Sequence, residues 1–218
     1  MDRRTRQHIA SRYDGHLQRL YVRSKLASDP VYAASRSVLA GSTLPLIDIG
    51  CGIGLLGQYL HACDHPAAYL GLDHDERKIA AGRRAAQRAG LAAAIQLRSA
   101  DAHDLPPMQG DVVLLDVLHY LSAQAQRSLL QQATRHLAPQ GRLIVRNVLR
   151  EANWRFHATR VEEFFLRVSG WIPGGAQHYP DADEVRRPLE AAGLVVRIAS
   201  LRGRTPFNSY LLVAQHAS

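Results

Sequence analysis

Hydrophobic positions along the first two thirds of the chain switch between two spacings. Short uninterrupted apolar runs, typical of buried parallel strands, alternate with longer segments in which apolar residues recur every three or four positions, as in amphipathic helices. The strands predicted in this way cover residues 44–49, 68–73, 93–98, 111–116 and 142–148. The helices predicted between them cover residues 53–63, 75–89 and 122–136. This alternation indicates parallel βαβ units and an α/β fold.

The N-terminal segment before the first strand has helical spacing only. Residues 2–23 carry apolar side chains on one helical face, and residues 31–40 form a second short helical pattern that ends at Gly41. Asp29 and Pro30 separate the two patterns, because proline and the residue before it disfavour helix. We expect residues 1–43 to form a helical lid over a site built by the rest of the chain.

The C-terminal third departs from the βαβ pattern. A helix is predicted over 150–169, an irregular Gly/Pro-containing loop over 171–180 and a helix over 181–192. The last two strands, 194–200 and 207–214, are joined by about six residues, which is too short for a parallel crossover. We therefore expect them to pair antiparallel and to close the sheet.

Length and composition are those of one globular domain. The chain has 218 residues, of which 46% are hydrophobic, enough for one α/β domain spanning 1–218 with a sizeable core. No apolar run is long enough to cross a membrane, and no apolar segment follows the basic N-terminus as in a secretory signal. Cys51 and Cys63 have no spacing typical of metal ligands or a disulfide framework. A cytoplasmic location is expected.

The formal charge of +8 comes almost entirely from arginine, since Lys25 and Lys78 are the only lysines. The arginines are scattered along the chain, and no basic run is interleaved with aromatic residues, so nucleic-acid binding is not favoured. A basic surface also suits an anionic substrate or an acidic partner such as an acyl carrier protein. The sequence leaves monomer and dimer open.

The most informative stretch follows the first strand. The apolar run ends in Asp48, and glycine then occupies alternate positions before an apolar helix begins. The residues of this turn are Gly50, Cys51, Gly52, Ile53, Gly54 and Leu55. A turn with so few side chains lets a ligand lie directly against the backbone at the N-terminus of a helix.

The pattern Asp-x-Gly-x-Gly-x-Gly from Asp48 to Gly54 resembles the first motif of class I S-adenosylmethionine (SAM)-dependent methyltransferases. The resemblance covers residues 44–148, expected to form the SAM-binding core, and extends to 180–214 at the level of fold. It implies a Rossmann-like, seven-stranded and mostly parallel sheet with one antiparallel strand and helices on both faces. It also implies SAM as the cofactor and S-adenosylhomocysteine as its product.

A second interpretation uses the same glycines. Residues from Gly52 to Gly57 also satisfy the Gly-x-Gly-x-x-Gly fingerprint of dinucleotide-binding folds, and an acid at Asp73 suits the ribose of either ligand. Asp48 separates the two interpretations. The methyltransferase resemblance implies that this acid lies near the methionine ammonium. A dinucleotide would instead place its negatively charged pyrophosphate near the turn, where the Asp48 carboxylate would repel it.

The resemblance assigns further cofactor residues along the chain. Asp73, at the end of the second strand, would accept hydrogen bonds from both ribose hydroxyls, and His74 would pack on the adenine. An alternative role for Asp73 is to cap the helix that follows. After the third strand, Asp101 would accept from the adenine amino group, and the backbone of Ala102, next to His103, would contact the ring.

The end of the fourth predicted strand, around Asp116, Val117 and His119, resembles the fourth motif of the family. Asp116 would lie near the methionine part of the cofactor or have a structural role, and Val117 is a further cofactor-binding candidate. His119 is the first candidate to contact both cofactor and substrate, and a histidine can take a proton from a hydroxyl at neutral pH. A histidine that only lines the cofactor is the open alternative, and Tyr120 is interpreted as a packing residue.

Substrate specificity in this family is often built from the segment after the fifth strand, here 149–180, with 181–218 forming a closing helix and antiparallel hairpin. The segment's aromatic and basic residues suit a flat or apolar ligand. The helical spacing of Trp154, Phe164 and Phe165 also fits a core role, which is the favoured interpretation of the two phenylalanines. They are Arg150, Trp154, Arg155, His157, Arg160, Phe164, Phe165, Trp171, His178 and Tyr179. His178 and Tyr179, in the Gly/Pro loop, are the candidates for substrate contact and catalysis. In the lid, Tyr13, Tyr21, Arg23 and Lys25 could fold over the site, where the resemblance implies that a cation could hold the SAM carboxylate. A plain surface helix is the open alternative.

Missing motifs narrow the chemistry. The Asn/Asp-Pro-Pro-aromatic motif of enzymes that methylate base amines is absent after the fourth strand. The Asp-Asn pair of cation-dependent catechol methyltransferases is replaced by Arg146 and Asn147, so no metal is expected.

We therefore expect methyl transfer to a small-molecule acceptor. A faint resemblance of 203–210 to methyltransferases of bacterial aryl polyene pathways suggests an aromatic or carrier-bound acyl acceptor. The alternatives are an RNA or protein methyltransferase and a non-catalytic SAM-binding protein.

Overall fold

The computed structural model describes five stretches of the chain: residues 1–65, 67–101, 107–151, 175–201 and 208–217. Several predicted features lie outside these stretches. They are Ala102, His103, most of the 150–169 helix and these aromatic and basic residues of the 149–180 segment: Trp154, Arg155, His157, Arg160, Phe164, Phe165 and Trp171.

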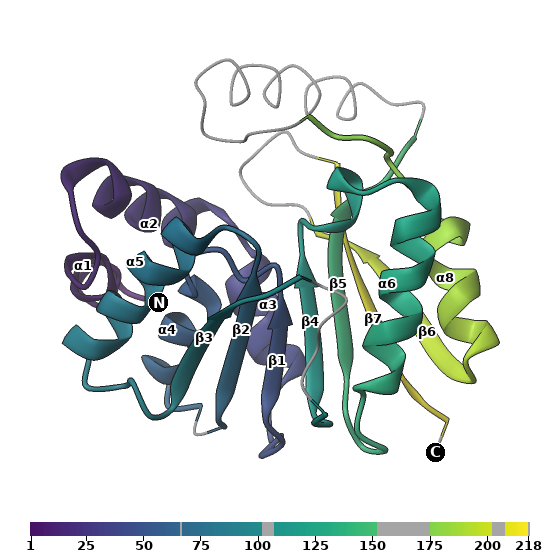
Figure 1. Ribbon diagram of the computed structural model, residues 1–218, viewed down its shortest axis with the longest axis horizontal. Helices are drawn as coiled ribbons and strands as arrows, with labels where there is room; N and C mark the ends of the chain where they lie inside the picture. The colour runs from purple at the N-terminus through teal and green to yellow at the C-terminus, as the bar shows by residue number, and fades with distance from the viewer. Residues whose placement is uncertain (66, 102–106, 152–174, 202–207, 218) are drawn as a thin grey trace.

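A single seven-stranded sheet organises the described residues, with strand order β3-β2-β1-β4-β5-β7-β6 (Figure 1). The strands are β1 Leu46–Ile49, β2 Tyr69–Asp73, β3 Ile95–Ser99, β4 Asp111–Leu115, β5 Leu143–Val148, β6 Leu194–Ser200 and β7 Ser209–His216. The pairs among β1 to β5 are parallel, and β7 is antiparallel to both of its neighbours. The predicted Rossmann-like sheet with one antiparallel strand is confirmed.

The helices lie on both faces of this sheet. They are α1 Arg3–Ser11, α2 His16–Ser28, α3 Val31–Val38, α4 Leu55–His61, α5 Glu76–Arg88, the 3₁₀ turn η1 Leu118–Tyr120, α6 Ala123–Arg135 and α8 Ala182–Ala191. Leu46 of β1 packs in a core with buried residues of α1 to α5, whereas Ile47, its neighbour, packs with α6 and α8. Alternate strand residues point to opposite faces, so one strand serves two cores. Figure 1 shows α1, α2 and α5 near the β3 end of the sheet and α6 and α8 near β6.

The N-terminal segment corrects one prediction. Residues 2–23 do not form one helix, because α1 ends at Ser11 and α2 begins only after Gly15, which has φ of +69°. Two bonds hold the break: the Tyr13 hydroxyl donates to the Ile53 carbonyl at 3.1 Å, and Arg19 Nε donates to the Tyr13 carbonyl at 2.9 Å. The turn between α1 and α2 is therefore bound to the glycine turn after β1.

The remaining boundaries follow local capping chemistry. Ser122 caps α6, and Asp181 caps α8 in a reciprocal capping box with Glu184. The last strand runs from 209 to 216 rather than over 207–214, because its register pairs Leu194 with His216. The short turn η1 after β4 was not predicted. Among the described residues, no helix has the length and hydropathy needed to cross a membrane.

Candidate functional site

The glycine turn follows the carboxyl end of β1 and leads into α4, and it is hydrogen-bonded to the carboxyl end of β2. Gly50, Gly52 and Gly54 have φ of 78°, 56° and 69°, a left-handed region that side chains disfavour. The amide of Gly52 donates to Asp73 Oδ2 at 2.8 Å. The turn is therefore anchored to β2 through a carboxylate, and its backbone forms part of the floor beside the strand ends.

Close contacts explain why side chains are absent from this floor. A Cβ atom on Gly50 would lie 2.3 Å from Cγ2 of Val117, at the end of β4. A Cβ atom on Gly71 of β2 would lie 2.7 Å from Sγ of Cys51. Both distances are below van der Waals contact, so there is no space for a methyl group at Gly50 or Gly71, whereas a Cβ atom on Gly52 would meet nothing within 4 Å.

Replacing Gly50 by alanine is expected to destabilise the fold more than the same change at Gly90. Both glycines are left-handed, which costs an alanine about 1–2 kcal/mol, but the added methyl at Gly90 meets nothing within 4 Å. The clash at Val117 should add about 1–3 kcal/mol for Gly50→Ala alone. Urea unfolding of the two variants measures the difference, and equal losses would show that Val117 moves aside freely.

Asp48 is buried beneath the turn, with 2% of its surface exposed. Its Oδ2 accepts from the Tyr69 hydroxyl at 2.5 Å, and its Oδ1 has no hydrogen-bond partner among the described residues. Burial raises the pKa of Asp48 to about 7, although the Tyr69 bond lowers it and Asp73 raises it further. An unpartnered buried carboxylate oxygen beside the turn fits a cationic ligand group, and its contact with the methionine ammonium stays a prediction.

Asp73 is nearly buried, with its two carboxylate oxygens already oriented. Oδ2 accepts from the Gly52 amide, and Oδ1 accepts from the amide of Asp75 at 2.9 Å. Each oxygen retains capacity for a further bond, as recognition of a ribose diol requires. The capping alternative is wrong, because Asp75 itself caps α5 by accepting from the Arg77 amide. The His74 side chain is 83% exposed beside Asp73.

Asp73→Asn is expected to weaken binding of S-adenosylhomocysteine by about 1–3 kcal/mol, the scale of hydrogen bonds to a charged group. The amide keeps one acceptor oxygen but loses the charge and the second acceptor. Calorimetric titration measures the loss. Asp75→Asn is the matched control, since its carboxylate serves α5 and Arg77, and it should leave the affinity within about twofold.

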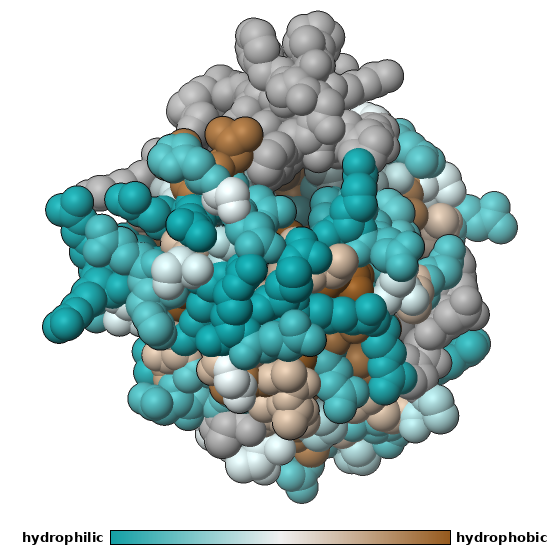
Figure 2. Space-filling view, turned by 60° about the vertical axis from the view of Figure 1, so that its left-hand side comes forward, coloured by the Kyte–Doolittle hydropathy of each residue, from teal (hydrophilic) through white to brown (hydrophobic). Residues whose placement is uncertain are grey.

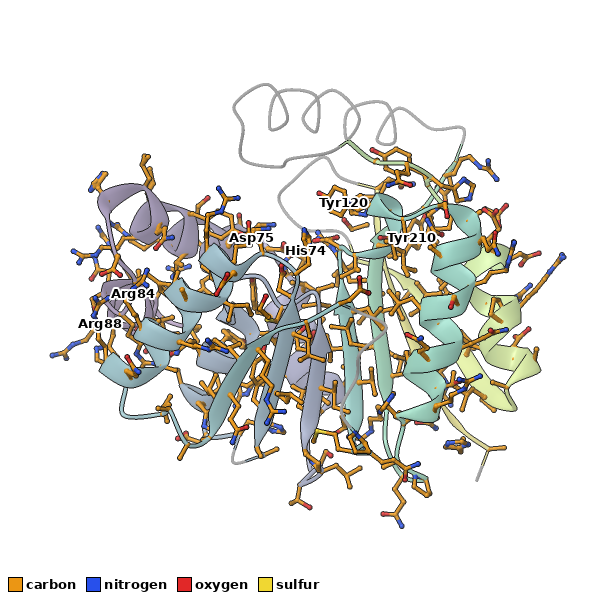
Figure 3. The ribbon with its side chains drawn as sticks, viewed as in Figure 1. His74, Asp75, Arg84, Arg88, Tyr120 and Tyr210 are labelled. Atoms are coloured by element: carbon orange, nitrogen blue, oxygen red, sulfur yellow. The ribbon has the colours of Figure 1, made fainter. Side chains whose placement is uncertain are left out.

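Asp101, the predicted adenine contact, is exposed at the start of the loop after β3. Figure 3 shows His74 and Tyr120 toward the same edge of the sheet, over β2 and the end of β4. The predicted cofactor residues that the structure describes therefore gather along the strand ends, where ligands of open α/β sheets bind.

A buried arginine links the end of β4 to the N-terminal helices. Arg146 of β5 forms ion pairs with Asp116 and, at 3.6 Å, with Asp29 in the loop between α2 and α3. Lys25 pairs with Asp29 at 3.2 Å. Although burial opposes it, the charges of Arg146 and Lys25 lower the pKa of Asp29. Asp116 is held in a left-handed conformation with φ of 60°, unusual for a residue other than glycine.

These contacts correct part of the predicted lid. Tyr13 is fully buried with its hydroxyl on the Ile53 carbonyl, so its side chain packs in the core instead of closing over a ligand. Lys25 is paired with Asp29. Arg84 and Arg88 of α5, visible in Figure 3, both bind Asp14 in the turn between α1 and α2. That residues 1–43 cover a bound ligand stays a prediction.

His119, in η1, has only 3% of its surface exposed. Its Nδ1 lies 2.8 Å from Oδ1 of Asn147 on β5. Its ring is stacked with that of Tyr179, with centroids 5.9 Å apart and planes 4° from parallel, and lies 4.1 Å from the ring of Tyr120. The structure thus brings together two predicted catalytic residues 60 positions apart in the sequence.

His178, the third catalytic candidate, has a different environment. Its Nε2 lies 3.0 Å from Oε1 of Glu184 at the start of α8, while its backbone carbonyl accepts from Gln126 of α6. The ring therefore contacts the helix cap, and the neighbouring ring of Tyr179 contacts His119. Within the described stretches, no cluster of three or more potential metal ligands occurs.

Sequence reasoning missed four residues that organise this site: Tyr69, Asp29, Arg146 and Asn147. All four are polar residues next to or inside apolar strands and helices. Arg146 and Asn147 were considered only because they stand where cation-dependent catechol methyltransferases have an Asp-Asn pair. A polar pair inside the otherwise apolar β5 was the available signal, since buried polar groups need partners.

The comparisons with known proteins agree with this geometry. A family model described as a methyltransferase domain matches residues 47–143. A ubiquinone biosynthesis O-methyltransferase from Sinorhizobium medicae (strain WSM419) is 30% identical over 185 residues, which cover 81% of this chain and 69% of the relative. One of the same name from Rhodopseudomonas palustris (strain BisB5) is 29% identical over 171 residues, covering 75% of this chain and 62% of the relative.

Among solved structures, magnesium protoporphyrin IX methyltransferase (ChlM) from Synechocystis PCC 6803 with bound S-adenosylhomocysteine has a TM-score of 0.69 at 17% identity. The match covers 98% of this chain and 94% of that chain, so the likeness extends over the whole fold. These findings decide between the two interpretations of the glycine turn in favour of SAM over a dinucleotide. By sequence relatives, sheet order and glycine turn, the chain belongs to the class I SAM-dependent methyltransferase family.

Proposed function

We propose that this chain is an enzyme that transfers a methyl group from SAM to a hydroxyl of a small aromatic acceptor. The observation that carries the proposal is the buried imidazole of His119, stacked on Tyr179 and bonded to Asn147 at the ends of β4 and β5. The names of the curated relatives specify O-methylation in ubiquinone biosynthesis. This chain covers about three fifths of the length of the first of them.

The residues that would hold the cofactor are those of the glycine turn with Asp48, Asp73 and Asp116. Their chemistry fits, because they combine a glycine-rich turn, a carboxylate with oriented oxygens and a buried carboxyl group with an unpartnered oxygen. When bound, SAM supplies a methyl group already activated by a positive sulfonium sulfur. The task left to the protein is to align the acceptor, exclude water and accept a proton.

His119 is the proposed proton acceptor. Its burial removes water from the ring, and its position after β4 is at the strand ends where the acceptor must meet the cofactor. The parallel ring of Tyr179 supports an aromatic acceptor, because flat rings favour offset stacking against other rings. We propose that Tyr179 orients the acceptor ring rather than exchanging a proton with it.

A carrier-bound acyl or aryl polyene intermediate is a second acceptor that we keep within this proposal. Its support is the formal charge of +8, which would attract an acidic carrier protein. Figure 2 shows a largely hydrophilic surface on the side where α1, α2 and α5 lie. A cytoplasmic location and the choice between monomer and dimer remain predictions from the sequence.

The test is methyl transfer from tritium-labelled SAM to a panel of acceptors. The panel contains free dihydroxybenzoates, the same acids as carrier-protein thioesters, transfer RNA and a cell protein extract. Transfer to the free or carrier-bound phenols, lost when their hydroxyl is replaced by hydrogen, would support the proposal. Labelling of RNA or protein instead would contradict it, and cofactor binding without transfer to any of them would favour a non-catalytic protein.

A further inference from the structure

Asn147 is a polar residue in the interior of the sheet. It lies on β5, pairs in register with Tyr210 of β7 and has no exposed surface. Its neighbours on the strand alternate between the two cores, with Val145 in the core formed with α6 and α8. A buried amide in such a position costs stability unless its polar atoms are bonded, which raises the question of what it binds.

Both polar atoms of the Asn147 amide have partners, and these determine its orientation. Nδ2 donates to the carbonyl oxygen of Val148 at 2.8 Å, and Oδ1 lies 2.8 Å from Nδ1 of His119. Turning the amide over would place Oδ1 against the Val148 carbonyl, so that two acceptors would face each other without a proton. The chemistry of the neighbours therefore selects the orientation in which oxygen faces the imidazole.

This orientation decides the protonation of the histidine. An amide oxygen only accepts, so Nδ1 of His119 must carry a hydrogen and donate it. In the neutral imidazole the lone pair is then on Nε2. The hydrogen of the His119 ring cannot move from Nδ1 to Nε2 without loss of the hydrogen bond to Asn147.

The backbone around His119 is held as firmly as the ring. The carbonyl of His119 accepts from the amide of Gln177 at 2.8 Å. The side-chain amide of Gln126 on α6 donates to the carbonyls of Leu118, Leu121 and His178. The turn η1 is thus bound to the segment that carries Tyr179, whose ring lies parallel to the imidazole.

We propose that Asn147 is a positioning residue that fixes the proton of neutral His119 on Nδ1 and so presents Nε2 as the base. This inference rests on the proposed function. The acceptor's hydroxyl proton passes to Nε2 as its oxygen bonds to the methyl carbon and the carbon–sulfur bond breaks. The resulting imidazolium keeps its Nδ1 hydrogen on Asn147 and later releases the proton from Nε2 to water.

An amide suits this role better than a carboxylate. It holds the ring through a hydrogen bond to Nδ1 and places no negative charge beside the imidazole. The titratable rings described next to His119 are the phenols of Tyr120 and Tyr179, which ordinarily ionise only near pH 10. The nearest charged groups along the chain and strand are Asp116 and Arg146, which pair with each other.

The first experiment reads the tautomer directly, without substrate. Nitrogen-15 NMR of protein labelled in its 11 histidines, with the signal assigned through His119→Gln, is expected to show the hydrogen of neutral His119 on Nδ1. Asn147→Leu should move the population toward the Nε2-protonated form. A wild-type signal with the hydrogen on Nε2 would overturn the inference and leave the proposed function standing.

The second experiment uses a matched pair of aspartate substitutions. Asn147→Asp keeps an acceptor but adds charge, so the acidic limb of the kcat–pH profile should move upward by at least about one unit. Asn208→Asp makes the same change at a buried asparagine whose amide donates to Leu149 and Glu151, and its profile should match wild type. Equal profiles for the two variants would refute a positioning role for Asn147.

The kcat of an Asn147 variant tests the positioning role of Asn147 separately from the proposed methyltransferase function. Asn147→Leu is expected to lower kcat about 10- to 100-fold with an unchanged affinity for S-adenosylhomocysteine, because the base loses its orientation but remains present. A normal kcat in a variant whose tautomer has shifted would contradict the inference. If Asn147→Leu fails to fold, the position of the His119 hydrogen in the wild-type protein still decides the question.

Discussion

Replacing His119 by alanine is expected to lower kcat at least a hundredfold while the affinity for S-adenosylhomocysteine changes by less than about threefold. General-base catalysis contributes about 10²–10⁴ in rate, and the alanine variant retains every carboxylate and glycine assigned to the cofactor. The measurement is the initial rate of methyl transfer at saturating cofactor, beside a calorimetric titration. A loss below tenfold with intact cofactor affinity would remove His119 from the role of base.

His178→Ala is the matched control. Both histidines were catalytic candidates, but the ring of His178 contacts Glu184, which closes the capping box of α8. Its removal should lower thermal stability slightly, since a cap contact contributes about 1 kcal/mol, and should lower kcat less than tenfold. A larger loss in His178→Ala than in His119→Ala would reverse the assignment of the base.

The free energy of unfolding is expected to rise when Asp48 is replaced by asparagine, with an effect that grows with pH. Burial raises the pKa of folded Asp48 to about 7, whereas the unfolded chain has the ordinary value of 3.8. The stabilising effect of the protonated form is therefore complete below pH 4 and is lost as pH rises toward 7. At about 1.4 kcal/mol per unit, the variant gains about 4 kcal/mol over wild type above pH 7.

Urea unfolding at pH 4, 6 and 8 measures this dependence. Asp29→Asn is the control of opposite sign, because the charges of Arg146 and Lys25 lower the pKa of Asp29 despite its burial. That variant should lose stability at pH 8, and its loss should fade as pH falls through the folded pKa of Asp29. A pH-independent difference between Asp48→Asn and wild type would show that Asp48 does not titrate in the folded protein.

The gain in stability should come with a functional loss. Asp48 has an unpartnered buried oxygen beside the glycine turn, and such destabilised polar groups are often kept because a ligand uses them. We expect Asp48→Asn to bind S-adenosylhomocysteine more weakly. Unchanged binding would indicate that the carboxylate serves only its bond with Tyr69.

Local chemistry in the sequence was enough to predict the order and type of most elements. The strand over 194–200 has the predicted bounds, and the helices predicted over 122–136 and 181–192 are α6 and α8, capped by Ser122 and Asp181. These features depend on residues within a few positions of one another, and so does the left-handed turn at Gly50, Gly52 and Gly54. The resemblance of that turn to the first motif of class I methyltransferases also predicted SAM as the cofactor.

Only the tertiary structure decided which polar side chains meet. Asn147 reaches His119 across 28 positions, because the parallel pairing of β4 and β5 brings their carboxyl ends together. Tyr69 reaches Asp48 across 21 positions, because β1 and β2 are neighbours in the sheet. The same folding buried Tyr13, which the sequence placed in a lid, and directed His178 away from Tyr179 toward Glu184. Element type depends on neighbours along the chain, whereas partners across the sheet depend on strand order and register, which local patterns do not contain.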